Sequence, residues 1–122
     1  MSQTAEIISP GFSVADTEDV LFNYDGEHLI LHFSDWRENP VQVIFENTIG
    51  CRYQLGEYQI CEGERFDSTH LIKNSQWLQR VQEQGETWEG AQWSHYKLNF
   101  NGVGVLEVLC TAIRKVGESV PK

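Results

Sequence analysis

Basic residues are scarce in this chain of 122 residues, which has nine Lys and Arg against eighteen Asp and Glu. The formal net charge is −9, and residues 1–50 carry nine of the acidic residues but only one basic residue, Arg37. Because phosphate groups are bound by clustered Lys and Arg, nucleic acid and anionic membranes are disfavoured as partners. The composition favours another protein with a basic surface, although net acidity is also a simple means of keeping a small protein soluble.

Cysteines and long apolar runs are also few. The three cysteines, Cys51, Cys61 and Cys110, lack the CxxC spacing of metal and redox sites, so we expect reduced thiols that are mostly buried. A disulfide between Cys51 and Cys61 stays open as the alternative for an exported protein. No apolar run approaches the ~20 residues of a membrane span. Residues 1–10 hold no Lys, no Arg and no signal-like apolar stretch, so we expect a cytoplasmic protein.

Catalytic and nucleotide-binding motifs are absent as well. No GxSxG is present for a nucleophilic serine, and Asp67, Ser68 and His70 lie too close in sequence to converge on one point. The Gly-x-Gly at residues 102–104 lies in a predicted hairpin and not between a strand and a helix. We therefore expect a protein that is not an enzyme and that binds no cofactor.

The four histidines do not predict a metal site. His28 and His32 share one face of a strand but lie about 13 Å apart, because each residue advances a strand by about 3.3 Å, so they cannot hold the same ion. We expect His32 to pair across a hairpin with Asp19, with a contact to a partner as the alternative. His70, in a polar connection, and His95, at the start of a strand, are expected to be surface or capping residues.

Strand-like alternation is the main positive signal. Residues 20–24 and 27–33 flank Asp25-Gly26, a dipeptide typical of a two-residue type I′ hairpin loop. A loop of this length pairs Phe22 with Leu29. It also directs five apolar side chains to one face, namely Val20, Phe22, Leu29, Leu31 and Phe33. The opposite face is half polar and is left for solvent or a partner.

The same alternation predicts further strands over residues 41–46, 51–55 and 58–61. Helical spacing occurs once, over residues 75–84, where a narrow apolar stripe is followed directly by a glycine that can end the helix.

A second hairpin closes the chain. Residues 95–100 and 103–113 flank Asn101-Gly102, which again favours a two-residue loop. This loop turns Lys97 away from the core, so Lys97→Ala should be tolerated. It places four residues in one core, namely Leu29, Phe33, Leu98 and Val105. Together these elements predict a mainly β fold, a two-layer antiparallel β-sandwich of about seven or eight strands with one α-helix, in a single domain over residues 1–122.

Three tryptophans lie where no core periodicity requires them. Trp88 and Trp93 occur in a Gly- and Glu-rich loop, and Trp36 in a polar connection. Trp is a favoured anchor at interfaces, so we interpret these residues as contacts for a partner, with capping of the open sandwich ends as the alternative. The predicted partner-binding residues combine them with the acids of the first half: Glu18, Asp19, Asp25, Glu27, Asp35, Trp36, Glu38, Trp88 and Trp93.

The size, the acidity and the hairpin over residues 95–108 with its Asn-Gly turn together resemble small bacterial immunity proteins and similar uncharacterised β-rich proteins. This resemblance implies a non-enzymatic inhibitor that occludes a cognate toxin, and a nuclease toxin would present a basic cleft. The expected function is therefore a protein-binding module, most concretely an immunity-type inhibitor. The alternative is a small-ligand or carbohydrate-binding β-sandwich in which Trp36, Trp88 and Trp93 serve as stacking platforms.

Overall fold

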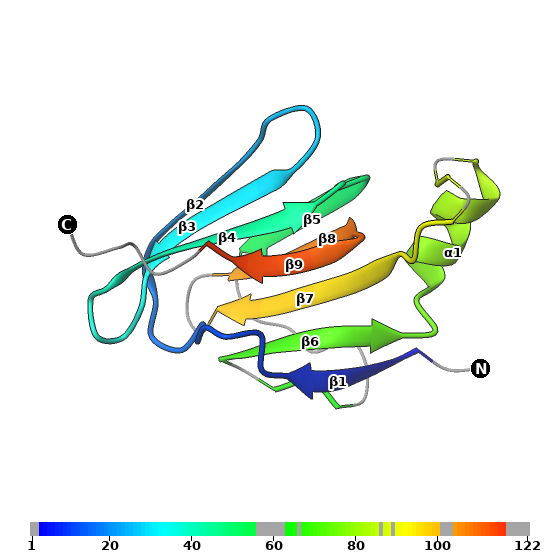
Figure 1. Cartoon of the computed structure of the whole chain (residues 1–122). Helices are drawn as coiled ribbons and strands as arrows, with labels where there is room; N and C mark the ends of the chain where they lie inside the picture. The colour runs from blue at the N-terminus through cyan, green and yellow to red at the C-terminus, as the bar shows by residue number, and fades with distance from the viewer. Residues whose placement is uncertain are drawn as a thin grey trace.

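The computed structural model (Figure 1) describes residues 3–55, 63–65, 67–85, 87–88, 90–100 and 104–116. In these residues, nine strands form two antiparallel sheets beside one helix, which confirms the predicted mainly β class. The five-stranded sheet has the order β1 (Thr4–Ile8), β6 (Ser68–Lys73), β7 (Ser94–Phe100), β8 (Gly104–Cys110) and β5 (Gly50–Leu55). The four-stranded sheet has the order β2 (Glu18–Tyr24), β3 (Leu29–Ser34), β4 (Pro40–Glu46) and β9 (Ala112–Lys115).

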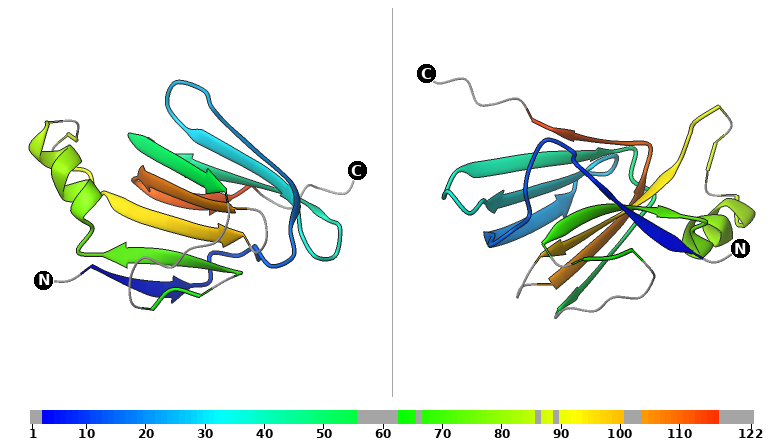
Figure 2. Two further views of the ribbon diagram at one scale, coloured as in Figure 1. Left: turned by 180° about the vertical axis from the view of Figure 1, so that it is seen from behind. Right: turned by 90° about the horizontal axis from the view of Figure 1, so that it is seen from below.

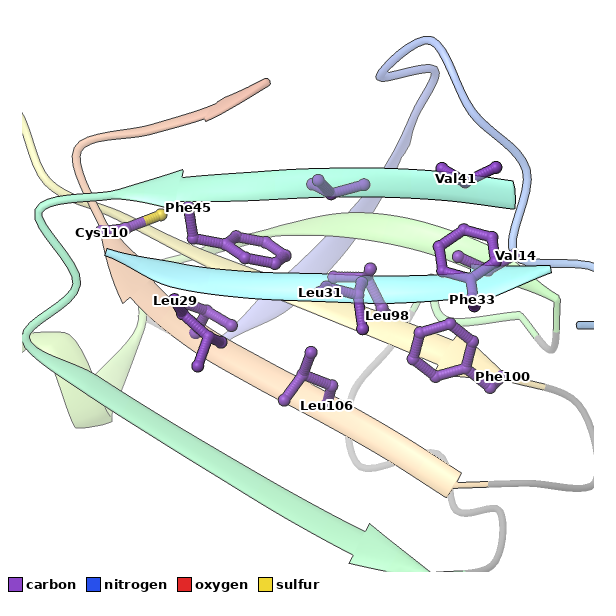
Figure 3. Close-up of a cluster of buried hydrophobic side chains, with 12 residues drawn as sticks. Val14, Leu29, Leu31, Phe33, Val41, Phe45, Leu98, Phe100, Leu106 and Cys110 are labelled. Atoms are coloured by element: carbon purple, nitrogen blue, oxygen red, sulfur yellow. The ribbon is translucent and has the colours of Figure 1, made fainter. Parts of the chain in front are cut away.

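The hydrophobic core lies between the two sheets (Figure 3). Its strand residues are Leu29, Leu31, Phe33, Val41, Val43 and Phe45 from β3 and β4, and Leu98, Phe100, Leu106, Val108 and Cys110 from β7 and β8. Phe33 and Phe100 meet edge to face across the layers, with 5.8 Å between their ring centroids. Because every second residue of a strand points inward, these alternating apolar residues seal the sandwich.

The β2–β3 hairpin has a longer loop than the sequence predicts. Tyr24 pairs with Leu29 and Phe22 with Leu31, so residues 25–28 form the connection. The Asp25 carboxylate accepts the N–H groups of both Glu27 and His28, at 2.9 and 2.7 Å, and this local bonding competes with a tight turn. The predicted pairing of Phe22 with Leu29 is wrong by two residues, and a shift of two leaves every side chain on its predicted face.

The predicted pair between His32 and Asp19 is also wrong. His32 lies opposite Leu21, and the register shifts between Glu18 and Leu21, where Asp19 has a φ of 57°. This irregularity is a β-bulge, which changes the direction of side chains at the start of β2.

The β7–β8 hairpin differs from the prediction by one residue. Leu98 pairs with Leu106 and Asn99 with Val105, so three residues, 101–103, separate the paired positions. A shift of one residue exchanges the two faces of the second strand. Leu98 therefore lies in the core as predicted, whereas Val105 is buried on the opposite face of the sheet. Lys97, expected to be exposed, is 1% exposed.

Three further elements differ from the expectations. β1 was not predicted, and the expected polar connection around His70 is strand β6. The chain also turns at Thr111, whose N–H donates to the carbonyl of Glu46, so the predicted strand over residues 103–113 is divided between β8 in one sheet and β9 in the other. The predicted strand over residues 58–61, with Cys61, lies outside the described residues.

The predicted helix is confirmed as α1 (Gln76–Glu83). Ser75 is its N-cap, with Oγ accepting the N–H of Leu78 at 3.0 Å. Figure 2 shows α1 beyond the end of the five-stranded sheet, where β6 ends and β7 begins. Within the described part of the chain, no helix is long and apolar enough to cross a membrane.

Candidate functional site

Five of the predicted partner-binding residues gather at one end of the four-stranded sheet. We call this group the acidic end: Glu18, Asp19, Asp35, Trp36 and Glu38. Glu18 starts β2 opposite Ser34, the last residue of β3, and the turn from β3 to β4 follows directly. The bulge at Asp19 lies beside the same turn, because Asp19 and Asp35 line one cavity.

The turn between β3 and β4 is held by Asp35. Its carboxylate accepts the N–H groups of Arg37 and Asn39, both at 2.9 Å, and its backbone carbonyl accepts the N–H of Glu38 at 2.8 Å. Trp36 therefore projects from a well-bonded turn and is 56% exposed. The Arg37 guanidinium lies 4.6 Å from the centroid of the Trp36 ring, a cation–π contact that orients the indole.

A cavity of about 630 Å³ opens at the acidic end. Its polar lining comes from Asp19, His32, Asp35, Gln42 and Lys115, and its apolar lining includes Phe33 and Val41. Carboxylates, an imidazole and an ammonium group therefore meet at one hollow surface beside an exposed indole. Such a surface suits a polar or cationic group of a partner.

Asp25 and Glu27 lie at the other end of the four-stranded sheet. They belong to the β2–β3 loop, and β3, which spans six residues, separates this loop from the acidic end by about 20 Å. The pKa of Asp25 lies below its usual value, because the backbone N–H groups of His28 and Glu27 stabilise the carboxylate. The predicted acidic residues thus form two groups and not one continuous surface.

Trp88 and Trp93 are separate from both acidic groups. Their rings meet edge to face at 4.7 Å between centroids, next to α1 and the start of β7. Trp93 is buried and Trp88 is exposed. Trp36, Trp88 and Trp93 therefore do not form one stacking platform.

The outer face of the five-stranded sheet holds a group of buried polar residues that the sequence analysis missed. The Lys97 ammonium and the Glu64 carboxylate lie 2.7 Å apart, with side chains 2% and 0% exposed. Asn99 Nδ2 also donates to Glu64, at 3.2 Å. The chain segment at residues 63–65 covers this part of the sheet and excludes water from the side chains of Lys97, Glu64 and Asn99.

His70 and His95 belong to the same face, so the prediction that they are surface or capping residues is wrong. His70 accepts the N–H of Arg65 at Nε2, 3.0 Å away, and its Nδ1 lies 3.3 Å from the carbonyl of Lys97. His95 lies between Ser75 and Glu107, with 2.6 Å from Nδ1 to Oγ and 2.7 Å from Nε2 to Oε1. Both imidazoles are at most 1% exposed.

Glu107 is the acidic centre of this face. Burial alone would raise the pKa of its carboxyl, but the hydrogen bond and charge of His95 and the charges of Arg52 and Lys97 outweigh burial, so the pKa is lowered. The Arg52 guanidinium contacts the same oxygen, Oε1, at 3.2 Å. Glu107 is therefore ionised at neutral pH and fixes the orientation of His95.

A sequence signal for these residues exists. His95, Lys97 and Asn99 alternate with apolar residues along β7, and Glu107 interrupts an apolar strand. With the observed loop of three residues, Lys97 and Glu107 pair directly across the strands. Two facts were missing: the loop length, since the two-residue loop would turn Glu107 toward the core with Val105, and the covering segment at residues 63–65, which buries Lys97 on its predicted outer face.

Comparison of the chain with protein-family models, with curated protein sequences and with solved structures finds no match. In the described residues, no group of three His, Cys, Asp or Glu side chains is arranged to hold a metal ion. Any proposal about function therefore depends on the geometry of the acidic end and of the buried polar face.

Proposed function

We propose that the protein is a protein-binding module, most concretely an immunity-type inhibitor in the cytoplasm, and that it binds a partner with a basic surface through the acidic end. The observation that supports this proposal is Trp36, an exposed indole on a well-bonded turn surrounded by Glu18, Asp19, Asp35 and Glu38. An aromatic anchor within a charged rim is typical of binding hot spots.

The two kinds of residue have different tasks in this proposal. The carboxylates attract the basic partner over long range and raise the association rate, an effect that salt screens. Trp36 enters a pocket of the partner and slows dissociation. Nucleic acid is not an expected partner, because the acidic end repels phosphate.

The test begins with capture of the partner by the full chain, followed by kinetic measurements on two matched variants. One variant neutralises two carboxylates of the acidic end with Glu18→Gln and Glu38→Gln. The other neutralises the opposite loop with Asp25→Asn and Glu27→Gln. We expect only the first to slow association, by roughly tenfold at low salt, and to reduce its salt dependence.

Trp36→Ala supplies the second arm of this test. It should leave the association rate nearly unchanged and increase the dissociation rate, because the anchor acts after encounter. Equal association rates for the two charge variants, or a Trp36→Ala variant with unchanged dissociation, would reject the acidic end as the binding surface.

The alternative function, binding of a small ligand or carbohydrate, is supported by the cavity of about 630 Å³ beside Trp36. Of the three tryptophans, Trp36 serves this alternative best: Arg37 covers one face of its ring and leaves the other for stacking, whereas Trp93 is buried and meets Trp88 edge to face. Titration with glycans, followed by tryptophan fluorescence, distinguishes the two functions. A saturable shift that disappears in Trp36→Ala would favour the ligand-binding alternative.

A further inference from the structure

Ser75, His95 and Glu107 form a continuous hydrogen-bonded relay. Because ionised Glu107 can only accept a hydrogen bond, His95 Nε2 carries the hydrogen in the 2.7 Å contact. In the neutral form of the imidazole, Nδ1 is then the acceptor that faces Ser75 Oγ, 2.6 Å away. A hydroxyl, a neutral imidazole and an ionised carboxylate in this order are the elements of an activated serine nucleophile.

Three different elements fix this relay in place. Ser75 stands in the short turn from β6 to α1, after Asn74 with a φ of 59°, His95 lies on β7, and Glu107 on β8. The Trp77 ring lies against the imidazole, with 5.3 Å between centroids, and the Arg52 guanidinium lies 4.0 Å from the Trp77 ring. Packing of this kind holds the imidazole in one orientation, as a catalytic base requires.

Ser75 and His95 also line an open groove of about 620 Å³ between α1 and the ends of β6 and β7. Trp93 lines the same groove, and its buried Nε1 has no hydrogen-bond partner among the residues that the structure describes. A buried donor without a partner is costly, so a ligand oxygen that accepts from Nε1 gains binding energy. The glutamines Gln76, Gln79 and Gln82 complete a polar side of the groove.

The first turn of α1 already holds a carbonyl-type oxygen. The N–H of Gln76, the residue after Ser75, donates to the side-chain amide oxygen of Gln3 at 3.0 Å. Amide groups and the helix dipole at a helix N-terminus stabilise developing negative charge. The oxygen of a substrate carbonyl that replaces Gln3 would occupy a position suited to an oxyanion.

Helix capping alone does not require this arrangement. An N-cap serine needs only to accept one backbone N–H, as Ser75 does from Leu78. The cap does not need the buried imidazole of His95 and carboxylate of Glu107 that follow the Ser75 hydroxyl, nor the groove that Ser75 lines. We propose that Ser75 is the nucleophile of an acyl-transfer site that cleaves small carboxylic esters bound in this groove.

The reaction balances with these residues alone. Ser75 Oγ forms a bond to the ester carbonyl carbon while its proton moves to His95 Nδ1, and Glu107 stabilises the resulting imidazolium. The bond to the alkoxy group then breaks, and the leaving alkoxide takes the proton from Nδ1. Water, deprotonated by the same nitrogen, attacks the acyl-serine. The bond between Ser75 Oγ and the acyl carbon then breaks, Oγ takes the proton back from Nδ1, and the carboxylic acid is released. This activity lies outside the proposed binding function and does not use the acidic end.

The experiment treats the full chain with a fluorophosphonate probe and locates the modified residue by mass spectrometry. We expect one probe per chain, attached to Ser75, and slow hydrolysis of p-nitrophenyl acetate. Ser75→Asn, which retains a capping side chain, should abolish both. His95→Gln should slow labelling by at least about 100-fold, the scale of general-base catalysis.

Ser13→Ala is the control, because Ser13 is an exposed serine outside both the relay and the groove, and it should label at the wild-type rate. Absence of the probe from Ser75 in the folded wild-type protein would overturn the proposal whatever the variants do. Labelling of Ser75 at an undiminished rate in folded His95→Gln would overturn the relay, since the serine would then react without its base.

Discussion

The outer faces of the two sheets both carry polar side chains, but their environments are opposite. On the four-stranded sheet, Asn23, His32 and Arg114 are exposed. On the five-stranded sheet, His70 and Lys97 are at most 1% exposed, although Lys97 alternates with core residue Leu98 and pairs across the strands with His70. The difference shows that strand alternation identifies the face of a side chain, whereas solvent exposure depends on what covers that face.

The cover comes from segments outside the strands. Glu64 reaches Lys97, the backbone of Arg65 reaches His70, and Trp77 of α1 packs against His95. In the described part of the chain, no such layer lies over the four-stranded sheet, where Leu21 is 67% exposed. On the five-stranded sheet, specific partners stabilise the buried side chains of Lys97 and Glu64, which pair with each other, and those of His70 and His95.

The largest expected effect comes from comparing two ion pairs, one on the outer face of each sheet. Lys97→Met should lower the free energy of unfolding by about 3–5 kcal/mol, because the Glu64 carboxylate stays buried without its cation. Arg114→Met removes the partner of Glu46 on the exposed face and should cost less than about 1 kcal/mol. Urea denaturation of both variants measures the contrast.

A double variant provides the control for this prediction. Lys97→Met combined with Glu64→Leu removes both buried charges and should recover much of the loss. If Lys97→Met alone were as stable as the wild type, the original expectation that Lys97→Ala is tolerated would hold, and the Lys97–Glu64 pair would not be buried as observed.

The core shared by both sheets should respond independently of these charges. Leu98→Ala and Leu29→Ala should each cost about 2–5 kcal/mol, because both side chains are buried in the interface between the layers. Their effects should add to that of Arg114→Met, since no contact connects these sites. Thermal unfolding of the single and combined variants tests this separation of layers.

A smaller effect concerns pH. Burial lowers the pKa of His70 from 6.5, opposed by the Lys97 carbonyl and the Glu64 charge, and the charge of Lys97 adds to the lowering. As pH falls through about 6.5, His70 therefore binds a proton in the unfolded chain but not in the folded chain. The free energy of unfolding decreases on acidification as a result. Protonation of Nε2 would also remove the acceptor for the N–H of Arg65.

The measurement is the slope of the unfolding midpoint between about pH 7 and pH 5.5. His70→Asn should flatten this slope, even though the variant is less stable at neutral pH. His32→Asn, on the exposed face of the other sheet, should keep the wild-type slope. Equal slopes for His70→Asn and the wild type would refute the assignment of the acid response to His70.

How much the sequence reveals is best seen in the two predicted hairpins. Both had a loop longer than the turn dipeptide suggests, by two residues at Asp25-Gly26 and by one at Asn101-Gly102. The first error left all faces correct, and the core positions of β3 were predicted. The second exchanged the faces of β8, so Val105 was assigned to the wrong layer. Lys97 was assigned to the correct outer face, and it is buried because Glu64 covers it there.

The candidate sites differ in the same way. The acidic end was predicted from local composition, because Asp35, Trp36 and Glu38 share one turn. The relay of Ser75, His95 and Glu107 could not be predicted, because its members lie on three separate segments. Ser75 is in the turn between β6 and α1, His95 is on β7 and Glu107 is on β8. No local sequence motif indicates that these three residues converge. Predicting their proximity requires both the correct strand register and the position of α1.

The smallest effect is expected on the exposed face itself. Leu21→Thr replaces a large apolar side chain on edge strand β2, and its exposed fraction of 67% means that little buried area is lost. Thr is a good strand former, so the change should shift the free energy of unfolding by no more than about 0.5 kcal/mol. Leu109→Thr makes the same replacement on the outer face of β8, where Leu109 is 0% exposed, and it should cost several times as much because a hydroxyl and a void replace packed methyl groups. Chemical denaturation of the two variants tests the comparison directly: similar costs would mean that the outer faces of the sheets are not covered differently.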